Sequence, residues 1–341
     1  MKKVLIAGAG GYLGTKLTKY LLAKGYEIIA LDRFFFGDTL SSLSQNKNLI
    51  IIKDDIRFID DRALKDVDVV VNLAAISNDP AGDLNLKITR EINLEGAVRL
   101  ASLAKKKGVK KYIFSSSCSV YGVGEGELVE ESRTAPVSEY GRSKVEAETA
   151  LLAEAGEKFC VTVLRMATLY GLSESRMRFD LIINVMTLHA WRDRKIYIMG
   201  GGKQWRPLLH IDDAVRAFEL ILMTRKLSLI NKRIFNVGSN SQNFQVFQIA
   251  NRFKKHFRDL SIEVAPGDPD PRSYKVNFDK INKLLDFEVK KTIDDGIKEI
   301  KIALENGTIA DDLKTNTLKY YQYLMESEMV LNSIKIRDRL F

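Results

Sequence analysis

Residues 3–14 read KVLIAGAGGYLG, and this pattern limits the folds that the chain can adopt. The apolar run at 3–7 predicts a buried strand, and residues 13–24 predict a helix directly after the glycines. Gly8, Gly11 and Gly14 allow the backbone to turn tightly, to approach a pyrophosphate closely and to direct helix N–H groups at it. The pattern therefore predicts a dinucleotide site at the first strand-to-helix turn.

The alternation of strands and helices continues over the first 170 residues. Further strands are predicted at 27–32, 49–53, 67–73, 111–115 and 161–167, with helices at 86–107 and 138–155. The strands are continuously apolar, as expected when helices cover both faces of a parallel sheet. After Tyr170-Gly171 the sequence indicates charged helices and loops with fewer strands. We predict an α/β fold, a Rossmann-type doubly wound parallel sheet with a smaller C-terminal α+β substrate domain.

Composition excludes several classes of function. The chain has 341 residues, of which 45% are hydrophobic and 28% charged, as in globular proteins. No apolar run is long enough for a membrane span, and a cytoplasmic location is expected. Two cysteines and three scattered histidines indicate neither a disulfide framework nor a metal site. The net charge of +9 is spread along the chain, so nucleic acid is not a predicted partner.

Tyr140 and Lys144 in YGRSK form the second informative pattern, with Ser117 upstream in SSSCSVYG. In a helix over 138–155 the tyrosine and lysine are four residues apart and share one face. We expect the ammonium, together with an oxidised nicotinamide, to lower the phenol pKa from its usual value of ~10, which would make Tyr140 a general base. Ser117 would bridge a substrate hydroxyl and the tyrosine oxygen.

Asp32 ends the second predicted strand and bears on the choice of cofactor. A carboxylate there accepts hydrogen bonds from ribose hydroxyls and repels a 2′-phosphate, which favours NAD over NADP. Arg33 could instead bind that phosphate. Asp55 and Ile56 are predicted at the adenine, although Asp55 could simply end a strand. The predicted cofactor-binding set is Gly8, Gly11, Tyr12, Leu13, Gly14, Asp32, Arg33, Asp55, Ile56, Leu73, Ala74, Ala75, Tyr140 and Lys144.

Together these patterns resemble the extended short-chain dehydrogenase/reductase family, specifically its nucleotide-sugar epimerase/dehydratase branch, which includes UDP-galactose 4-epimerases. The resemblance spans roughly residues 1–310 and rests on the segments GAGGYLG, DI (55–56), NLAA (72–75), SSSCSVYG (115–122), PVSEYGRSK (136–144), LRMATLYG (164–171) and RPLLHIDD (206–213). It implies catalytic roles for Ser117, Tyr140 and Lys144.

The resemblance also implies a nucleotide-diphosphate sugar as substrate. Asn184, Arg206 and Arg272 match polar residues that contact the diphosphate in the family, and an arginine suits this role because its planar fork donates two hydrogen bonds. Ser117 and Ser119 complete the predicted substrate-binding set, whereas His210 and Asp212 are interpreted as structural.

The resemblance divides the chain into an NAD-binding Rossmann domain at 1–171, joined by segments near 208–240, and a nucleotide-sugar-binding domain at 172–314. Residues 315–341 form a helical extension of one or two amphipathic helices, and the proline-rich segment 265–272 is predicted to be a loop. A homodimer is expected, because helices 86–107 and 139–155 form a four-helix contact in similar enzymes.

The sequence also departs from the family pattern. The 4,6-dehydratases carry an Asp-Glu pair directly after the catalytic threonine, whereas this chain has Cys118 and Ser119, so dehydration is disfavoured. The loop ISNDPAGDL at 76–84 is atypical of epimerases. We predict an epimerase that acts through transient oxidation at carbon 4. A 4-dehydrogenase or 4-ketoreductase is the main alternative, and an NAD-binding sensor or scaffold is the non-enzymatic one.

Overall fold

The structure is a computed structural model that describes residues 2–265 and 272–335. Most of the predicted loop at 265–272 and the last residues of the predicted extension therefore lie outside the described residues. Within the described ranges, every helix is too short or too polar to cross a membrane.

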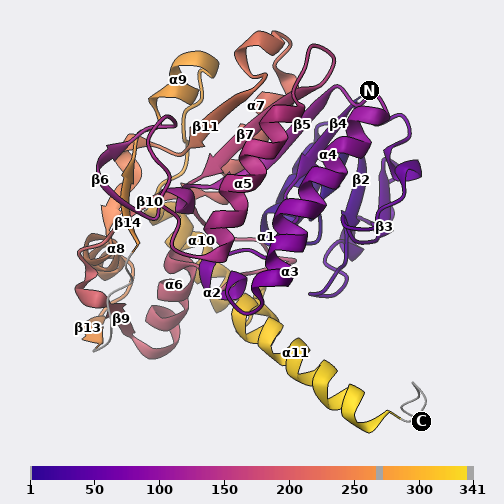
Figure 1. Cartoon of the computed structure of the whole chain (residues 1–341). Coiled ribbons are helices and arrows are strands. Elements are labelled where there is room, and N and C mark those ends of the chain that lie inside the picture. The colour runs from indigo at the N-terminus through magenta and orange to yellow at the C-terminus, as the bar shows by residue number, and fades with distance from the viewer. Residues whose placement is uncertain (1, 266–271, 336–341) are drawn as a thin grey trace.

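A parallel sheet of seven strands forms the centre of the molecule (Figure 1). Its order is β11-β7-β5-β4-β1-β2-β3, so the direction in which strands are added reverses beside β1. The strands are β1 (Lys3–Ala7), β2 (Glu27–Asp32), β3 (Leu49–Lys53), β4 (Val69–Asn72), β5 (Lys111–Ser117), β7 (Cys160–Met166) and β11 (Arg233–Val237). This topology confirms the predicted doubly wound α/β fold. Ligands of such sheets bind outside the carboxyl ends of the strands at the switch point.

Helices cover both faces of the sheet (Figure 1). They are α1 (Tyr12–Ala23) and α7 (Ile211–Met223) on one face, and α4 (Ala97–Lys106) and α5 (Glu139–Glu154) on the other. Successive side chains of β1 point to opposite faces. Val4 therefore belongs to the apolar cluster that contains Leu17 and Phe218, and Leu5 to the cluster that contains Leu100 and Leu151.

The predicted helix at 86–107 is interrupted. It consists of α3 (Leu86–Arg90), a π-helical turn at Glu91–Gly96, and α4. Asn93 is buried in this turn, where its amide exchanges hydrogen bonds with the backbone of Ile76 at 2.8 and 3.1 Å. The wider turn thus coincides with a polar contact to the loop after β4, a contact that apolar periodicity does not reveal.

Strand β3 departs from the prediction of continuous burial. It lies at the edge of the sheet, where Ile50 and Ile51 are 52% and 40% exposed. The apolar sequence of this strand predicts burial on both faces, but helices do not cover this edge completely.

Outside the central sheet, the chain contains more strands than predicted. They form small sheets beside the central one, namely β12-β10-β8, β13-β9 and β14-β6. The strands are β6 (Val123–Leu128), β8 (Thr168–Tyr170), β9 (Lys195–Met199), β10 (Trp205–His210), β12 (Asn243–Gln245), β13 (Ser261–Ala265) and β14 (Ser273–Val276). The helices are α2 (Asp79–Gly82), α6 (Ile182–Asp193), α8 (Val246–Arg252), α9 (Asp279–Leu285), α10 (Ile293–Glu305) and α11 (Thr317–Ile334). Strands this short carry little periodicity, so the sequence did not reveal them.

Candidate active site

A cavity of about 790 Å³ lies at the carboxyl ends of the central strands. It brings together residues that are as far apart in the sequence as Gly8 and Tyr321. Of the residues predicted for catalysis, cofactor or substrate, all but Asn184 line it: Gly8, Gly11, Tyr12, Leu13, Gly14, Asp32, Arg33, Asp55, Ile56, Leu73, Ala74, Ala75, Ser117, Ser119, Tyr140, Lys144, Arg206 and Arg272.

The glycine loop connects β1 to α1 and packs very tightly. Gly8 has a φ of +84°, and a Cβ atom there would lie 2.7 Å from the backbone nitrogen of Ala74 at the end of β4. A Cβ atom on Gly14 would lie 2.0 Å from the carbonyl oxygen of Gly8. The loop therefore tolerates no side chain at either position. Its path places the N-terminus of α1, whose first N–H groups have no intrahelical partner, at the cavity.

Asp32 lies at the end of β2 and anchors the loop. Its carboxylate oxygens accept hydrogen bonds from the backbone N–H groups of Gly10 at 3.0 Å and Phe34 at 2.6 Å. Burial raises the pKa of Asp32, and these backbone hydrogen bonds counteract the rise. Each carboxylate oxygen can accept a second hydrogen bond, so the residue can still bind a ribose hydroxyl.

The neighbouring charged residues are already paired. Arg33 donates to Asp55 at 3.2 Å, and Arg57 donates to the same carboxylate at 2.8 Å. Burial opposes ionisation of Asp55, but its contacts with Arg57 outweigh burial and lower the pKa. Arg33 and Asp55 thus line the cavity as partners of one another, an arrangement that the sequence did not indicate.

Tyr140 lies in the first turn of α5, which Ser138 caps by accepting a hydrogen bond from the N–H of Gly141 at 3.1 Å. Burial raises the pKa of Tyr140 to about 12, although a side-chain hydrogen bond with Ser117 acts in the opposite direction. Burial thus disfavours the phenolate more strongly than the neighbouring side chains favour it. The predicted lowering of this pKa includes the charge of an oxidised nicotinamide and stays a prediction.

Lys144 is buried one turn further along α5. Its ammonium donates to the carbonyl oxygen of Ser115 at 2.8 Å and lies 5.9 Å from the centre of the Tyr140 ring. Burial lowers the pKa of Lys144 to about 7, and the nearby Glu148 carboxylate acts in the opposite direction. The shared helix face is as predicted, while the direct partner of the ammonium is the end of β5.

A buried ion pair supports this end of β5. Glu148 and Arg165 are each 4% exposed in their side chains, and their closest charged atoms lie 2.7 Å apart. Glu148 also accepts a hydrogen bond from the Ser116 hydroxyl at 2.5 Å. The pair therefore connects α5 with β5 and β7 directly behind Ser117 and Lys144.

The other end of the cavity contains the residues predicted for substrate. The Ser119 hydroxyl is buried and has no hydrogen-bond partner among the described residues. Arg206 donates to the backbone oxygen of Trp205 at 2.8 Å and to that of Arg272. Arg272 forms an ion pair with Asp79, a cavity residue that the sequence analysis did not assign. This end of the cavity is thus lined by two guanidinium groups that have protein partners and by a buried hydroxyl that has none among the described residues.

Asn184 does not reach the cavity. It is fully buried in α6, where its amide nitrogen donates to Tyr12 Oη at 3.2 Å and to the carbonyl oxygen of Arg178 at 2.9 Å. Its amide oxygen accepts from the N–H of Gly171 at 3.0 Å. Because both the nitrogen and the oxygen of the amide are hydrogen-bonded within the protein, Asn184 connects α6 to Tyr12 and Gly171 and does not contact the cavity.

The segment RMRFD at 176–180 supplies three cavity residues that were not predicted from the sequence, namely Arg176, Arg178 and Asp180. Arg178 pairs with Asp180 through two contacts of 2.9 Å and donates to the Ser77 hydroxyl at 3.0 Å. Asn78 donates to Asp180 at 3.0 Å. The segments 76–80 and 176–180 are therefore joined by hydrogen bonds and line the cavity together.

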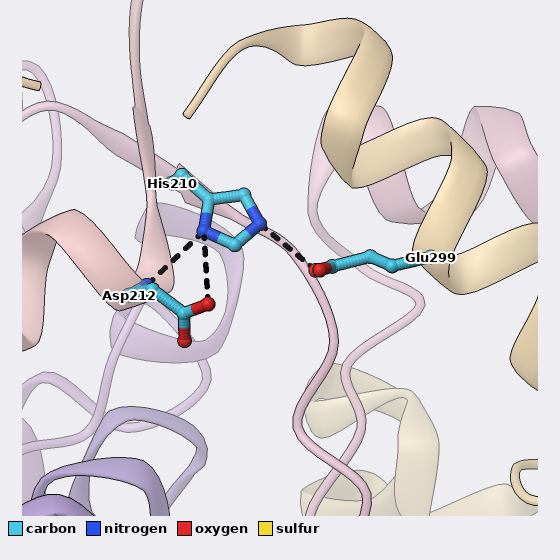
Figure 2. A group of neighbouring side chains, drawn as sticks. All are labelled: His210, Asp212 and Glu299. Carbon is cyan, nitrogen blue, oxygen red and sulfur yellow. Dashed lines mark hydrogen bonds and ion pairs between the residues drawn. The ribbon is translucent and has the colours of Figure 1, made fainter. Parts of the chain in front are cut away.

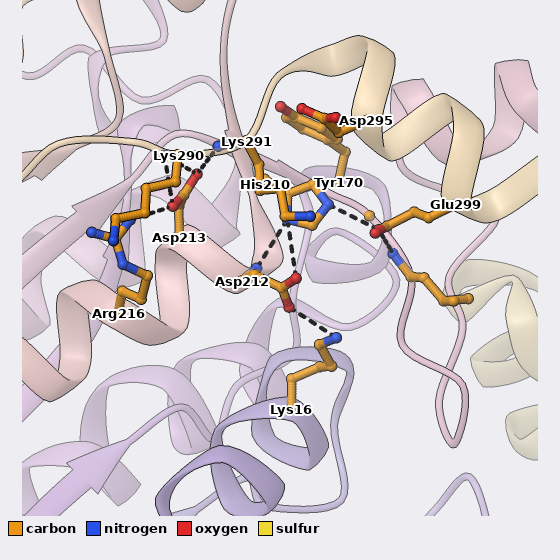
Figure 3. Close-up of polar contacts among 12 residues, drawn as sticks. Lys16, Tyr170, His210, Asp212, Asp213, Arg216, Lys290, Lys291, Asp295 and Glu299 are labelled. Carbon is orange, nitrogen blue, oxygen red and sulfur yellow. Dashed lines mark hydrogen bonds and ion pairs between the residues drawn. The ribbon is translucent and has the colours of Figure 1, made fainter.

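His210, Asp212 and Glu299 form a separate cluster (Figure 2). His210 Nδ1 accepts from the N–H of Asp212 at 3.2 Å, and His210 Nε2 lies 2.8 Å from Glu299. Lys16 pairs with Asp212 at 2.9 Å (Figure 3). Both imidazole nitrogens thus have protein partners and no lone pair remains for a metal ion, so we interpret the cluster as a link between β10, α1 and α10.

Known proteins similar to this chain are consistent with a dinucleotide-binding site in the cavity. Residues 4–238 match the NAD dependent epimerase/dehydratase family. The chain is 26% identical over 321 residues to the uncharacterized UDP-glucose epimerase YtcB of Bacillus subtilis (strain 168). The alignment covers 86% of this chain and 95% of YtcB. It is also 26% identical to a UDP-N-acetyl-alpha-D-glucosaminuronate decarboxylase of Bacillus cytotoxicus, over 87% of this chain and 96% of the relative.

Among solved structures, the UDP-glucuronic acid 4-epimerase from Bacillus cereus in complex with UDP-glucuronic acid and NAD superposes with a TM-score of 0.79. The two sequences are 25% identical, and the superposition covers 89% of this chain and 99% of the epimerase. These matches confirm the resemblance, the cofactor NAD and the assignment as an enzyme, and they leave the sensor or scaffold alternative without support. Since the family match extends over more than half of its length, the chain belongs to the NAD dependent epimerase/dehydratase family.

Proposed function

We propose that this enzyme is a nucleotide-sugar 4-epimerase. One observation carries the proposal: Ser117, Tyr140 and Lys144 line the same cavity as the glycine loop and Asp32. A proton acceptor and a site that fits a dinucleotide thus share one space. Oxidation of a sugar hydroxyl requires both, because the proton and the hydride leave from adjacent atoms.

Tyr140 would accept the proton of the hydroxyl at carbon 4, with Ser117 hydrogen-bonded to both oxygens. When bound at the glycine loop and Asp32, NAD would supply the hydride acceptor and donor for carbon 4, and its oxidised ring would add a positive charge to the cavity. That charge favours the phenolate of Tyr140, as does the ammonium of Lys144 whenever it is protonated. Arg206 and Arg272, which surround the other end, suit the diphosphate of the substrate.

The residue after Ser117 supports epimerisation over dehydration. Cys118 is buried, and its thiol donates to the carbonyl oxygen of Arg165 at 3.4 Å. Burial raises the pKa of this thiol, which keeps it protonated. A position that would supply an acid for the loss of water therefore holds an inert group. Related proteins named as epimerases agree with this proposal, although decarboxylases are also similar to the chain.

The fate of the hydride tests the proposal. The purified protein would be mixed with a panel of UDP-, GDP-, dTDP- and CDP-sugars, while absorbance of reduced nicotinamide and the sugar NMR spectrum are recorded. A 4-epimerase should invert carbon 4 with flat absorbance and without added NAD. Stoichiometric reduced nicotinamide without an inverted sugar would instead establish the 4-dehydrogenase or 4-ketoreductase alternative.

Asp32 is expected to determine cofactor choice. The parent protein should bind NAD more tightly than NADP, and Asp32→Ala should weaken NAD binding by about tenfold, because a hydrogen bond to a charged group is lost. Titration calorimetry with both cofactors measures the difference. Asp38→Ala is the matched control, since Asp38 is exposed in the same loop and does not line the cavity. Tighter binding of NADP by the parent would overturn this role.

We also propose a homodimer formed through α3 to α5. Leu86 and Ile88 on α3 are 53% and 39% exposed, which leaves apolar surface beside α5. Light scattering should give twice the chain mass at micromolar concentration. A monomer mass over that range would contradict the dimer.

A further inference from the structure

The C-terminal segment Leu313–Tyr321 forms part of the cavity wall. Asn316, Thr317, Leu318 and Tyr321 line the same cavity as Asp32. This segment lies outside residues 4–238, the range that matches the family. We infer that residues 313–321, which we call the C-terminal clamp, hold NAD at its adenosine end and slow its release.

The clamp is fastened to the loop that follows Asp32. The Tyr320 hydroxyl donates to the carbonyl oxygen of Phe35 at 2.9 Å. The ring of Tyr321 lies 6.1 Å from that of Phe35, edge to face, and 5.7 Å from that of Phe36. Aromatic pairs in this range stabilise the contact beyond the burial of their surface. The clamp therefore packs on Phe35 and Phe36, three and four residues after Asp32, the predicted ligand of the ribose.

A second attachment leads to the segment 176–180. The N–H of Phe179 donates to the carbonyl oxygen of Thr315 at 2.8 Å, and Arg176 Nη2 donates to the Thr317 hydroxyl at 3.0 Å. Asn316 caps α11 by accepting from the N–H of Lys319 at 3.1 Å. The start of α11 is thus held by the protein body, whereas the rest of the helix runs away from it (Figure 1).

Arg176 gives an independent indication of a ligand. Its side chain is buried at the cavity, with the guanidinium 3.5 Å from the centre of the Phe36 ring. Its Nε has no hydrogen-bond partner among the described residues. Buried donors in proteins are rarely left without an acceptor. A phosphate or hydroxyl oxygen of the dinucleotide is an acceptor of suitable chemistry, and Thr317 helps to hold the guanidinium in place.

Tyr321 contributes a neutral hydroxyl to this end of the cavity. Burial raises its pKa to about 12, Arg178 and Arg176 counteract the rise, and the Asp32 carboxylate adds to it. Tyr321 therefore stays protonated at neutral pH and can donate a hydrogen bond. The clamp thus lines the cavity without adding a negative charge that would repel a pyrophosphate.

The rate of NAD release tests the clamp. This inference rests on the proposed placement of NAD at the glycine loop. Protein loaded with NAD would be diluted into buffer containing an NAD-consuming enzyme, and loss of bound cofactor followed over time. Tyr321→Ala should release NAD about tenfold faster. Thr317→Val, which keeps the side-chain volume, should release it several-fold faster.

Two variants that leave the clamp intact serve as controls for the rate of NAD release. Ending the chain after Met325 removes residues 326–341, which include the projecting part of α11 but none of the clamp. Met329→Ala changes a side chain that is 73% exposed, so neither variant should alter release. Circular dichroism and thermal unfolding verify that each variant is folded. Release within twofold of the parent for both Tyr321→Ala and Thr317→Val would overturn the clamp while leaving the cofactor site intact. A parent protein that binds no NAD would instead refute the proposed site, and the clamp with it.

Discussion

Replacing Tyr140 by phenylalanine should lower turnover by about 10²–10⁴-fold, the usual contribution of a positioned acid or base. The variant removes one oxygen atom and keeps the rest of the side chain, whose Cβ lies so close to Gly82 that a Cβ atom there would be 2.8 Å away. The cavity should therefore keep its shape. Turnover of the preferred nucleotide sugar, followed by NMR, measures the change.

Binding measurements separate a catalytic role of Tyr140 from a structural one. NAD and nucleoside diphosphate affinities of Tyr140→Phe should stay within a few-fold of the parent, because the phenol is needed for proton transfer rather than for holding the ligands. Tyr197→Phe makes the same chemical change at another residue of the cavity and should leave turnover nearly unchanged. Turnover of Tyr140→Phe close to the parent value would remove Tyr140 from the catalytic set.

The cofactor side of the cavity was largely predictable from the sequence because its signals are local. Gly8 and Gly14 follow a strand and begin a helix. A side chain on Gly8 would clash with the backbone of Ala74, and one on Gly14 with the loop itself. Tyr140 and Lys144 are four residues apart on α5, so their proximity follows from helix geometry. In each case a few consecutive residues determine the arrangement.

Other parts of the site depend on contacts between distant segments. The pKa of Tyr140 follows from burial, which no local spacing reveals. Asn184 has the expected residue type, but Tyr12 and Gly171 occupy its amide. Thr317 contributes to the cavity only because α11 returns to Arg176. Such contacts leave no periodic pattern in the sequence, so they could not be predicted from it.

The buried pair of Glu148 and Arg165 leads to the largest expected effect on stability. Glu148→Gln removes the negative charge and leaves a buried guanidinium without its counter-ion. Loss of one partner from such a pair typically costs about 3–5 kcal/mol. That is a large part of the stability of a globular protein, about 5–15 kcal/mol. The free energy of unfolding from urea titration should fall by this amount.

Glu154→Gln provides the matched control for Glu148→Gln. Glu154 lies on the same helix and pairs with Lys105 at 2.9 Å, but both side chains are substantially exposed, at 33% and 45%. Its loss should cost less than about 1 kcal/mol. Equal effects of the two variants would show that Glu148 is no more important to folding than a surface residue.

The same substitution should also affect Lys144, one of the residues proposed for catalysis. Burial lowers the pKa of Lys144, and the Glu148 carboxylate partly counteracts this lowering. Glu148→Gln should therefore lower the Lys144 pKa further, so that the ammonium is lost at a lower pH. In folded protein, the pH at which Lys144 deprotonates can be followed by NMR of the labelled side chain. An unchanged pKa, measured together with the expected loss of stability, would limit Glu148 to a structural role behind β5.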